Sequence, residues 1–304
     1  MLPAMYTAIG GLQNHQLMLD VTAANIANVD TVGYKAQRTD FEAMVAQQLR
    51  GASAPSTTGG IGGTNPEEVG LGMTVGSIGT VLTQGSMQTT GQWSDLAING
   101  DGYFIVSNSQ NPNTATAPTI AFTRSGNFTV DSNGNLVDPH GQYVLGLANA
   151  APTGPPPYPT PVLATTLSSL QVPQGATGVS IDQTGTVSCT LNGGLYEIGQ
   201  IQLANFPNPG GLSRVGQNDF KDTPNSGAFS LAAVAPPPPA GVAAWSAPTT
   251  SGTGYIQAGA LEMSNVDLSQ EFTNMIVAQR GFQANARVIT TSDEVLQELV
   301  NLKH

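Results

Sequence analysis

The sequence predicts an α+β protein, with a helix at each end of the chain and a middle that is rich in β-strands. At both ends, apolar residues recur with alternating steps of four and three, which is typical of helices that pair along a heptad seam. Between the ends, short alternating apolar runs are separated by Gly, Asn and Asp turns, as in β-hairpins. The simplest arrangement pairs the two helices with each other and holds the β-rich middle apart.

The N-terminal repeat ends at a turn-rich stretch that runs from Asn28 to Gly33. Pro3 suits the first turn of a helix, where its missing N–H has no helical partner. Gly10 and Gly11 weaken a helix, but they also allow another helix to approach closely. The predicted seam residues are Met5, Ile9, Leu12, Gln16, Leu19, Ala23 and Ile26.

The C-terminal repeat is longer and more regular. Asp267, followed three residues later by Gln270, resembles a capping box with Asp in place of Ser or Thr. A helix from here to the last residue would be about 55 Å long, which is long for a globular domain. Its predicted seam residues are Leu268, Phe272, Met275, Gln279, Phe282, Ala286, Ile289, Asp293, Leu296 and Val300.

The C-terminal apolar stripe is wider than one helix pair requires. Burying a large apolar side chain contributes about 1.5–3 kcal/mol, so an uncovered row is costly. Either the β-rich middle or other copies of the protein must therefore cover it. The residues of this second row are Ile276, Val288, Val295, Leu299 and Leu302.

Composition divides the chain into three predicted parts. Residues 1–30 together with 267–304 form a terminal helical domain. Residues 31–75 form an extended linker segment, and residues 76–266 form the β-rich body.

Turns and loops punctuate the predicted β-rich body. The sequences DSNG at 131–134 and DQTG at 182–185 are an internal echo and predict hairpin turns. The Pro-rich stretches at 153–161 and 235–241 predict solvated, polyproline-like loops.

Charge and hydropathy exclude several classes of partner. The chain has 20 acidic and 9 basic residues, a net charge of −11, and its basic residues do not cluster. Nucleic acids and anionic membranes both require basic patches, so neither is expected as a partner. A bilayer-spanning run of about 20 apolar residues is absent, so we expect no membrane insertion. The N-terminus lacks the pattern of a cleavable signal peptide, which leaves either a cytoplasmic location or export without one.

No residue pattern predicts a catalytic centre, a metal site or a cofactor. The single cysteine, Cys189, excludes an intrachain disulfide, and the three histidines lie far apart in the sequence. The glycine-rich stretch 59–72 lacks the signature of a phosphate-binding loop. A polysaccharide-active enzyme would require two facing carboxylates, which the sequence does not display. An adhesin would not require apolar helices at both ends.

Polar residues interrupt both apolar seams. Asn25 and Asn28 suit either capping and turn formation or hydrogen bonds that fix the register between helices. Gln279 lies on the C-terminal seam, where a register-setting contact explains it best. Asp293 fits the same idea, or a pair with a basic residue of another copy.

Five stretches of the chain form long, distinctive patterns: ANIANVDTVGYK (24–35), GLGMTVGSI (71–79), DLAINGDGYFIV (95–106), FTRSGNFTVDSNGNL (122–136) and SNVDLSQEFTNMIVAQRGFQANARVITTSDEVLQELVNL (264–302). They cover both ends of the chain and much of the β-rich body, and the terminal patterns are long enough to be specific. Together they resemble the bacterial flagellar rod and hook protein family. Within the family the chain resembles the short hook proteins most, with the distal rod proteins as the alternative.

The resemblance implies a structural protein and not an enzyme. In such assemblies the terminal helices pair as a coiled coil and pack with those of many copies around a central channel, with the β domain outside. A hook subunit would polymerise into a curved tube that transmits motor torque to the flagellar filament. The implied location is the hook or basal body, outside the cell after export without a cleaved signal. The implied partners are further copies, distal rod and hook–filament junction proteins, the hook cap during assembly, and the flagellar type III export apparatus.

These expectations assign residues to two roles. Phe41 and Val45 form a short hydrophobic element that is a candidate export signal, although packing of an extended segment explains it equally well. The residues expected at the assembly interface are Met5, Ile9, Leu12, Leu19, Asn25, Ile26, Asn28, Leu268, Phe272, Met275, Gln279, Phe282, Ile289 and Leu296.

Overall fold

The structure is a computed structural model of the chain, which divides into two compact units. The first unit comprises Met1–Ala27, Gln37–Val81 and Val266–His304, and the second comprises Asn28–Ala36 and Leu82–Asn265. The Pro-rich loops predicted at 153–161 and 235–241 lie outside the described residues. The residues described are 2–54, 62–113, 119–149, 163–164, 166–230, 242–250 and 252–302.

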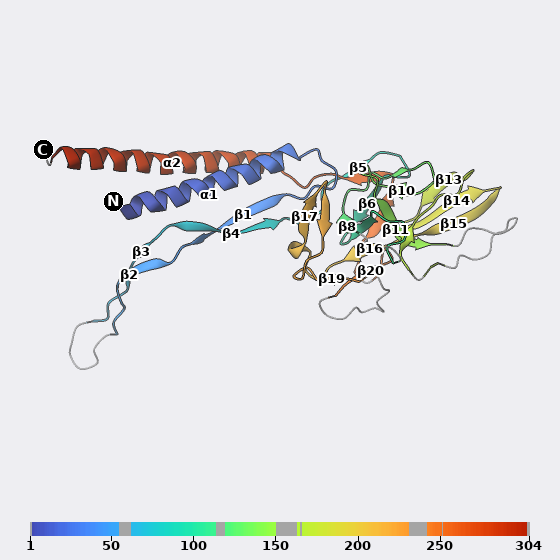
Figure 1. The fold of residues 1–304 in the computed structure, drawn as a ribbon, viewed down its shortest axis with the longest axis horizontal. Coiled ribbons are helices and arrows are strands. Elements are labelled where there is room, and N and C mark those ends of the chain that lie inside the picture. The colour runs from blue at the N-terminus through green and yellow to red at the C-terminus, as the bar shows by residue number, and fades with distance from the viewer. Residues whose placement is uncertain are drawn as a thin grey trace. The chain divides into compact units, whose positions relative to one another are not determined.

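The first unit contains the two long helices, α1 (Leu2–Ala27) and α2 (Leu268–Asn301), which lie side by side (Figure 1). The carboxylate of Asp267 begins α2 by accepting hydrogen bonds from the backbone N–H groups of Ser269 and Gln270. The Gln270 side chain does not complete a capping box, because it donates to Asn274 Oδ1 instead. Together with the strands of the second unit, these helices confirm the predicted α+β class.

The first unit also contains a long antiparallel hairpin. Strands β1 (Gln37–Ala43) and β4 (Met73–Thr80) pair with a β-bulge between Asp40 and Phe41. Strands β2 (Ala46–Arg50) and β3 (Glu67–Gly70) pair further out. Paired β structure therefore occupies residues 37–43, 46–50, 67–70 and 73–75 of the segment expected to be an extended linker.

The second unit is built on a 14-stranded sheet with two small two-stranded sheets beside it. In the main sheet the order β13-β14-β15-β11-β7-β16-β20-β19 is antiparallel, except that β19 pairs parallel with β20. The small sheets pair β5 (Met87–Thr89) with β22 (Ala260–Glu262), and β6 (Leu96–Asn99) with β21 (Tyr255–Ala258). The other elements are β7 (Tyr103–Ser107), β8 (Ile120–Thr123), β9 (Thr129–Val130), β10 (Leu136–Val137), β11 (Tyr143–Ala148), β12 (Ser168–Ser169), β13 (Thr177–Ile181), β14 (Thr186–Leu191), β15 (Gly194–Ile201), β16 (Leu203–Asn205), the 3-10 helix η1 (Pro209–Gly211), β17 (Ser213–Gly216), β18 (Asp219–Lys221), β19 (Ala228–Phe229) and β20 (Val242–Ser246).

Strand β7 shows why the second unit has two apolar cores. Successive side chains of a strand point to opposite faces of a sheet. Phe104 and Val106 accordingly enter one core cluster, and Tyr103 and Ile105 enter the other. Both faces of β7 are covered, which explains its continuous apolar sequence.

A four-residue turn recurs three times in the second unit. In each copy the Asp N–H donates to the carbonyl four residues on, and the Gly N–H donates to the Asp carbonyl. The glycines take φ between 77° and 90°, where a Cβ atom would be strained. The two predicted turns are confirmed and a third joins them; the turns are Asp131–Gly134, Asp138–Gly141 and Asp182–Gly185.

Candidate assembly interface

Helices α1 and α2 pack antiparallel. A Cβ atom placed on Gly11 would lie 2.7 Å from Asn285 Nδ2, and one on Gly281 would lie 2.5 Å from His15 Nε2. Further along α1, Asn25 Nδ2 donates to Glu271 Oε1 at 3.2 Å. The contacts pair Gly11 with Asn285, His15 with Gly281 and Asn25 with Glu271, so residue numbers rise along α1 as they fall along α2. These contacts define the register of the pair.

The face through which α2 meets α1 combines small and polar residues with half-buried apolar ones. Ala278 is fully buried, and Gly281 allows the His15 ring to lie directly against the α2 backbone. Four apolar residues of the predicted seam are half-buried: Met275, Phe282, Ile289 and Leu296. Other large apolar side chains of α2 are exposed on the two flanks of this face.

Asn25 is the main polar contact of the first unit. Its side chain is 1% exposed and exchanges two hydrogen bonds with the backbone of Gln37, at 2.8 and 2.9 Å. It also donates to Glu271, so one amide connects α1, the start of β1 and α2. Burial raises the pKa of Glu271, and the hydrogen bond from Asn25 opposes this rise. Of the two expected roles for Asn25, the geometry matches contact between elements.

The structure places the other expected interface residues at several depths. Those exposed are Ile9, Leu268, Phe272 and Gln279. Those half-buried are Met5, Leu12, Leu19, Ile26, Asn28, Met275, Phe282, Ile289 and Leu296.

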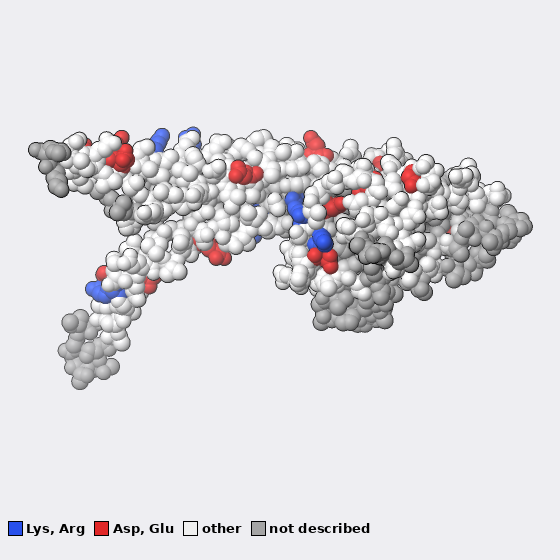
Figure 2. All heavy atoms as spheres, in the orientation of Figure 1, with Lys and Arg blue, Asp and Glu red and all other residues white. Residues whose placement is uncertain are grey.

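Most of the exposed large apolar side chains of α2 form two rows, one on each side of the α1-facing row. Phe272 is 51% exposed, and Val295 on the opposite flank is 45% exposed. Charged residues are sparse over the visible surface of this unit (Figure 2). We call these rows the α2 flanks; one contains Leu268, Phe272 and Ile276, and the other contains Val277, Val288, Val295 and Leu299.

The candidate export residues lie in different surroundings. Phe41 in β1 is half-buried, with its ring edge-on to His15 at 6.1 Å between centroids. Val45 lies between β1 and β2 and is 82% exposed. Leu49 and Val69 on β2 and β3 are also exposed, so the outer hairpin presents uncovered apolar side chains.

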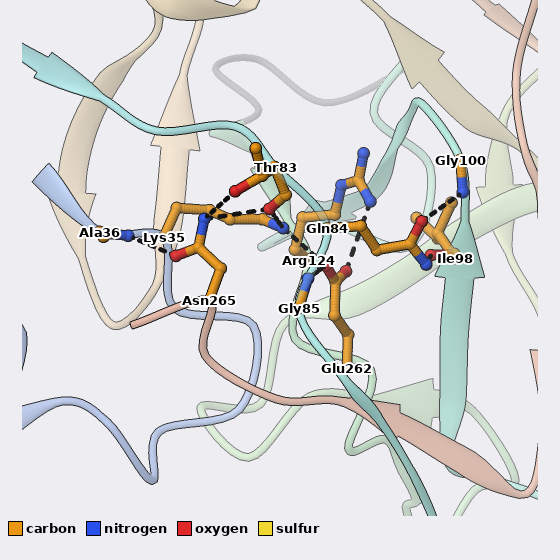
Figure 3. A network of polar contacts seen from close by, with 10 residues as sticks. All are labelled: Lys35, Ala36, Thr83, Gln84, Gly85, Ile98, Gly100, Arg124, Glu262 and Asn265. Atoms are coloured by element: carbon orange, nitrogen blue, oxygen red, sulfur yellow. Dashed lines mark hydrogen bonds and ion pairs between the residues drawn. The ribbon is translucent and has the colours of Figure 1, made fainter. Parts of the chain in front are cut away.

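A buried charge cluster in the second unit joins the residues that follow α1 in sequence to those that precede α2 (Figure 3). Glu262 is completely buried, and its Oε1 accepts hydrogen bonds from Lys35 Nζ at 2.6 Å and from Gly85 N at 3.0 Å. Its Oε2 lies 3.4 Å from Arg124 Nη1. We call Lys35, Arg124 and Glu262 the clamp.

The electrostatics of the clamp follow from its burial. Burial lowers the pKa of Lys35, and the nearby charge of Arg124 lowers it further. The hydrogen bond and negative charge of Glu262 oppose both effects. One carboxylate thus serves two buried cations, so its removal would leave charges without compensation.

The clamp lies next to the points where the chain passes from one unit to the other. Three of these passages follow Ala36, Val81 and Asn265. Asn265 Oδ1 accepts from the Ala36 N–H at 2.7 Å, and its Nδ2 donates to the Thr83 carbonyl at 3.0 Å. Lys35 Nζ donates to the same carbonyl at 3.0 Å (Figure 3). Within the second unit, hydrogen bonds therefore join the three connecting segments at residues 35–36, 83 and 265 to one another.

The β17–β18 hairpin also contacts the segment 32–35, which follows α1 in the sequence. The Arg214 guanidinium lies over the Tyr34 ring at 4.8 Å and donates to the Lys35 carbonyl. Asn218 Nδ2 donates to the Val32 carbonyl at 2.9 Å. The sequence analysis missed these residues and the clamp, because no local pattern connects residues so far apart in the chain.

Other kinds of site were also sought across the part of the chain that the structure describes. No group of three or more His, Cys, Asp or Glu side chains there is placed to hold a metal ion. None of the described helices combines the length and apolar character needed to span a membrane.

Comparison with known proteins places three family models on the chain. A model described as "Flagella basal body rod protein" matches residues 5–35. One described as "Flagellar hook protein FlgE/F/G D1 domain" matches residues 97–189. One described as "Flagellar basal body rod FlgEFG protein C-terminal" matches residues 257–302. The matches include both helices and half of the β structure.

Similar full-length proteins include rod and hook proteins. The flagellar basal-body rod protein FlgG of Bacillus subtilis is 42% identical over 304 residues, which cover 100% of both chains. The FlgG of Caulobacter vibrioides is 33% identical over 302 residues, or 99% of both chains. The flagellar hook protein FlgE of Borreliella burgdorferi is 29% identical over an alignment of 466 positions that covers 100% of both chains.

Proposed function

We propose that this chain, which belongs to the flagellar rod and hook protein family, is a structural subunit of the flagellar rod that assembles with many copies of itself. The observation that carries self-assembly is the pair of α2 flanks, which expose apolar side chains on both sides of the α1-facing row. Because the two flanks lie on different sides of α2, two neighbouring copies are needed to cover them. Contacts of this head-to-tail kind produce open helical polymers.

Assembly through the α2 flanks has an energetic basis. Covering a large apolar side chain contributes about 1.5–3 kcal/mol. The seven flank residues are at least 39% exposed in the single chain, so neighbours remove much apolar surface from water. In the polymer the terminal helices would pack as coiled coils, with the α1-facing row of α2 inside each pair and the flanks between pairs.

Length favours a rod subunit over a hook subunit. The Bacillus rod protein aligns end to end over 304 residues, the length of this chain. The alignment with the Borreliella hook protein needs 466 positions, so long stretches of that protein have no counterpart here. The chain therefore has the size of the rod proteins.

A hook subunit remains the second candidate. The D1 family model that matches residues 97–189 is described as a hook protein domain, and the Borreliella hook protein aligns with the whole chain. In that role the polymer would be a curved tube that transmits motor torque to the filament. The distal rod, hook–filament junction and hook cap proteins would then be neighbours.

The proposed role also assigns a location and an export route. The subunit would lie in the flagellum and reach it through the flagellar type III export apparatus. The exposure of Val45 supports recognition by that apparatus, whereas the contact of Phe41 with His15 supports a packing role for Phe41. We assign the chain no enzymatic role.

Localisation of a tagged subunit tests the rod assignment. An epitope inserted between Asn192 and Gly193, at the exposed tip of the β14–β15 hairpin, should disturb the fold little. Immunogold microscopy of purified hook–basal bodies should then place gold on the rod. Gold along the hook would refute the rod assignment and favour the second candidate.

A further inference from the structure

A pocket of about 330 Å³ in the second unit differs in chemistry from the rest of the chain. It lies where β11, β12 and β15 meet the segment after β7. None of its described lining residues is charged at neutral pH, although the whole chain carries a net charge of −11. Its walls instead contain five amide side chains, those of Gln110, Asn111, Asn135, Asn149 and Gln171.

Hydrogen bonds hold several of these amides in place. Asn135 is 2% exposed, and its Nδ2 donates to Asp131 Oδ2 at 3.0 Å. Asn149 Nδ2 donates to the Glu197 carbonyl at 3.0 Å, and Gln171 Nε2 donates to the Asn133 carbonyl at 2.8 Å. Polar groups that are fixed before binding lose little conformational entropy when a ligand arrives.

The pocket also offers unused polar groups together with apolar lining residues. The exposed side chain of Gln110 makes no hydrogen bond with the described residues, and the Oε1 of Gln171 accepts none from them. Tyr196 and Ile198, which are 5% and 2% exposed, also line the pocket and supply a ring face and an aliphatic side chain. The volume lies near the lower end of the range for small-ligand pockets, about 300–1,000 Å³.

We propose that this pocket binds a neutral saccharide. A sugar hydroxyl both donates and accepts hydrogen bonds, and an amide side chain supplies both functions. The Tyr196 ring and the Ile198 side chain suit contact with the C–H face of a sugar ring. A charged ligand would lose its hydration without meeting an opposite charge, and an apolar ligand would leave the amides without partners. The inference is independent of the proposed assembly, because it concerns one chain.

Titration of the full-length chain with two uncharged sugars tests this proposal. The probes are the trimer of N-acetylglucosamine and maltotriose, followed by chemical shifts of the backbone amides. At least one probe should give saturable shifts at residues that line the pocket. The Gln110→Ala, Gln171→Ala double variant should weaken its binding about tenfold or more, because two hydrogen-bonding groups are removed. Both residues are exposed, so the double variant should fold.

A matched control separates the pocket from general amide contacts. Gln92→Ala removes an exposed amide elsewhere in the second unit and should leave binding unchanged. Absence of saturable shifts with both sugars would overturn the proposal. Binding that survives unchanged in the double variant, or that weakens equally in Gln92→Ala, would also overturn it.

Discussion

Lys35 Nζ lies 2.6 Å from Glu262 Oε1, and both side chains are almost completely removed from solvent. The two residues are 227 positions apart in the sequence, yet each lies close to a point where the chain passes between the units. Charged groups are rarely placed in such surroundings without a specific partner. The contact therefore fixes which connecting segments lie together.

Replacement of the clamp carboxylate should be strongly destabilising. Glu262→Gln leaves Lys35 and Arg124 buried without their counter-charge, and broken buried pairs cost about 3–5 kcal/mol. The loss should be measured as the free energy of unfolding from hydrogen exchange in β22 and β5. The control is Glu67→Gln, whose partner Arg50 is 55% exposed, and it should cost less than about 1 kcal/mol. Equal effects of the two variants would contradict the structural role of the clamp.

Asp219 should make the stability of the second unit depend on pH. Burial raises the pKa of Asp219 above its usual 3.8, and the nearby charge of Asp138 raises it further, against a hydrogen bond from Gln142. The folded state then binds this proton more tightly than the unfolded chain does. The free energy of unfolding contributed by this group falls as pH rises through the raised pKa, and it is greatest below the unfolded value.

Asp219→Asn should therefore be more stable than the wild type at pH 7, with an advantage that shrinks toward about pH 4. The new amide keeps an oxygen to accept the hydrogen bond from Gln142. Urea titrations at a series of pH values measure the difference. Asp20→Asn, at an exposed site in α1, serves as the control for the loss of one negative charge. An advantage for Asp219→Asn that grows as pH falls would reverse the predicted sign.

Gly281→Ala should destabilise the helix pair even though alanine favours helices. The added methyl would lie 2.5 Å from the His15 ring, so either this ring must move or the helices must separate. Overpacking of this kind costs about 1–3 kcal/mol. Hydrogen exchange at Thr22 and Ala278, which are buried, reports the change.

Gly10→Ala is the matched control, because its methyl would meet only the Met73 carbonyl, at 3.8 Å. That variant should gain about 0.5–1 kcal/mol from the better helix propensity of alanine. If Gly281→Ala stabilised the pair as much as Gly10→Ala, the close approach of α1 and α2 would be incorrect.

In the turn between β17 and β18, glycine should raise the stability of the protein at position 217 but not at position 218. Gln217 and Asn218 have φ of 58° and 64°, a region that costs residues with a Cβ about 1–2 kcal/mol. Gln217→Gly should raise the melting temperature, because it relieves this strain. Asn218→Gly should bring no gain, because it removes the hydrogen bond to the Val32 carbonyl. A melting temperature that rises more for Asn218→Gly would show that this bond is unimportant.

Local signals in the sequence predicted the elements but not their contacts. Asp267 marked the start of α2, and the D-x-x-G pattern marked the hairpin turns, because caps and turns depend on neighbouring residues. Gly11 was expected to let another helix approach closely, and α2 does so there. The seam of large apolar residues did not mark Gly281, whose importance lies in the space it leaves.

Contacts between distant segments account for the rest. Arg124 and Glu262 are 138 positions apart, and each read alone is an ordinary charged residue. Residues 31–75 were expected to be an extended segment. The sequence did not predict how β1 to β4 pair, since these strands are polar, small or exposed and lack a clear alternation. The pairing of β1 with β4 and of β2 with β3 follows from the three-dimensional structure and not from the sequence of any one strand.

The most direct test of the central claim asks whether the α2 flanks contact other copies. A photo-crosslinking amino acid in place of Val295, which is 45% exposed, should give covalent dimers and longer ladders of this chain in purified basal bodies. The same residue in place of Thr190, exposed on β14 in the second unit, provides the control and should give fewer such products. Ladders from position 295 would establish the flank as a contact between copies. A chain that stays monomeric after irradiation at 295, in assembled basal bodies, would contradict assembly through α2.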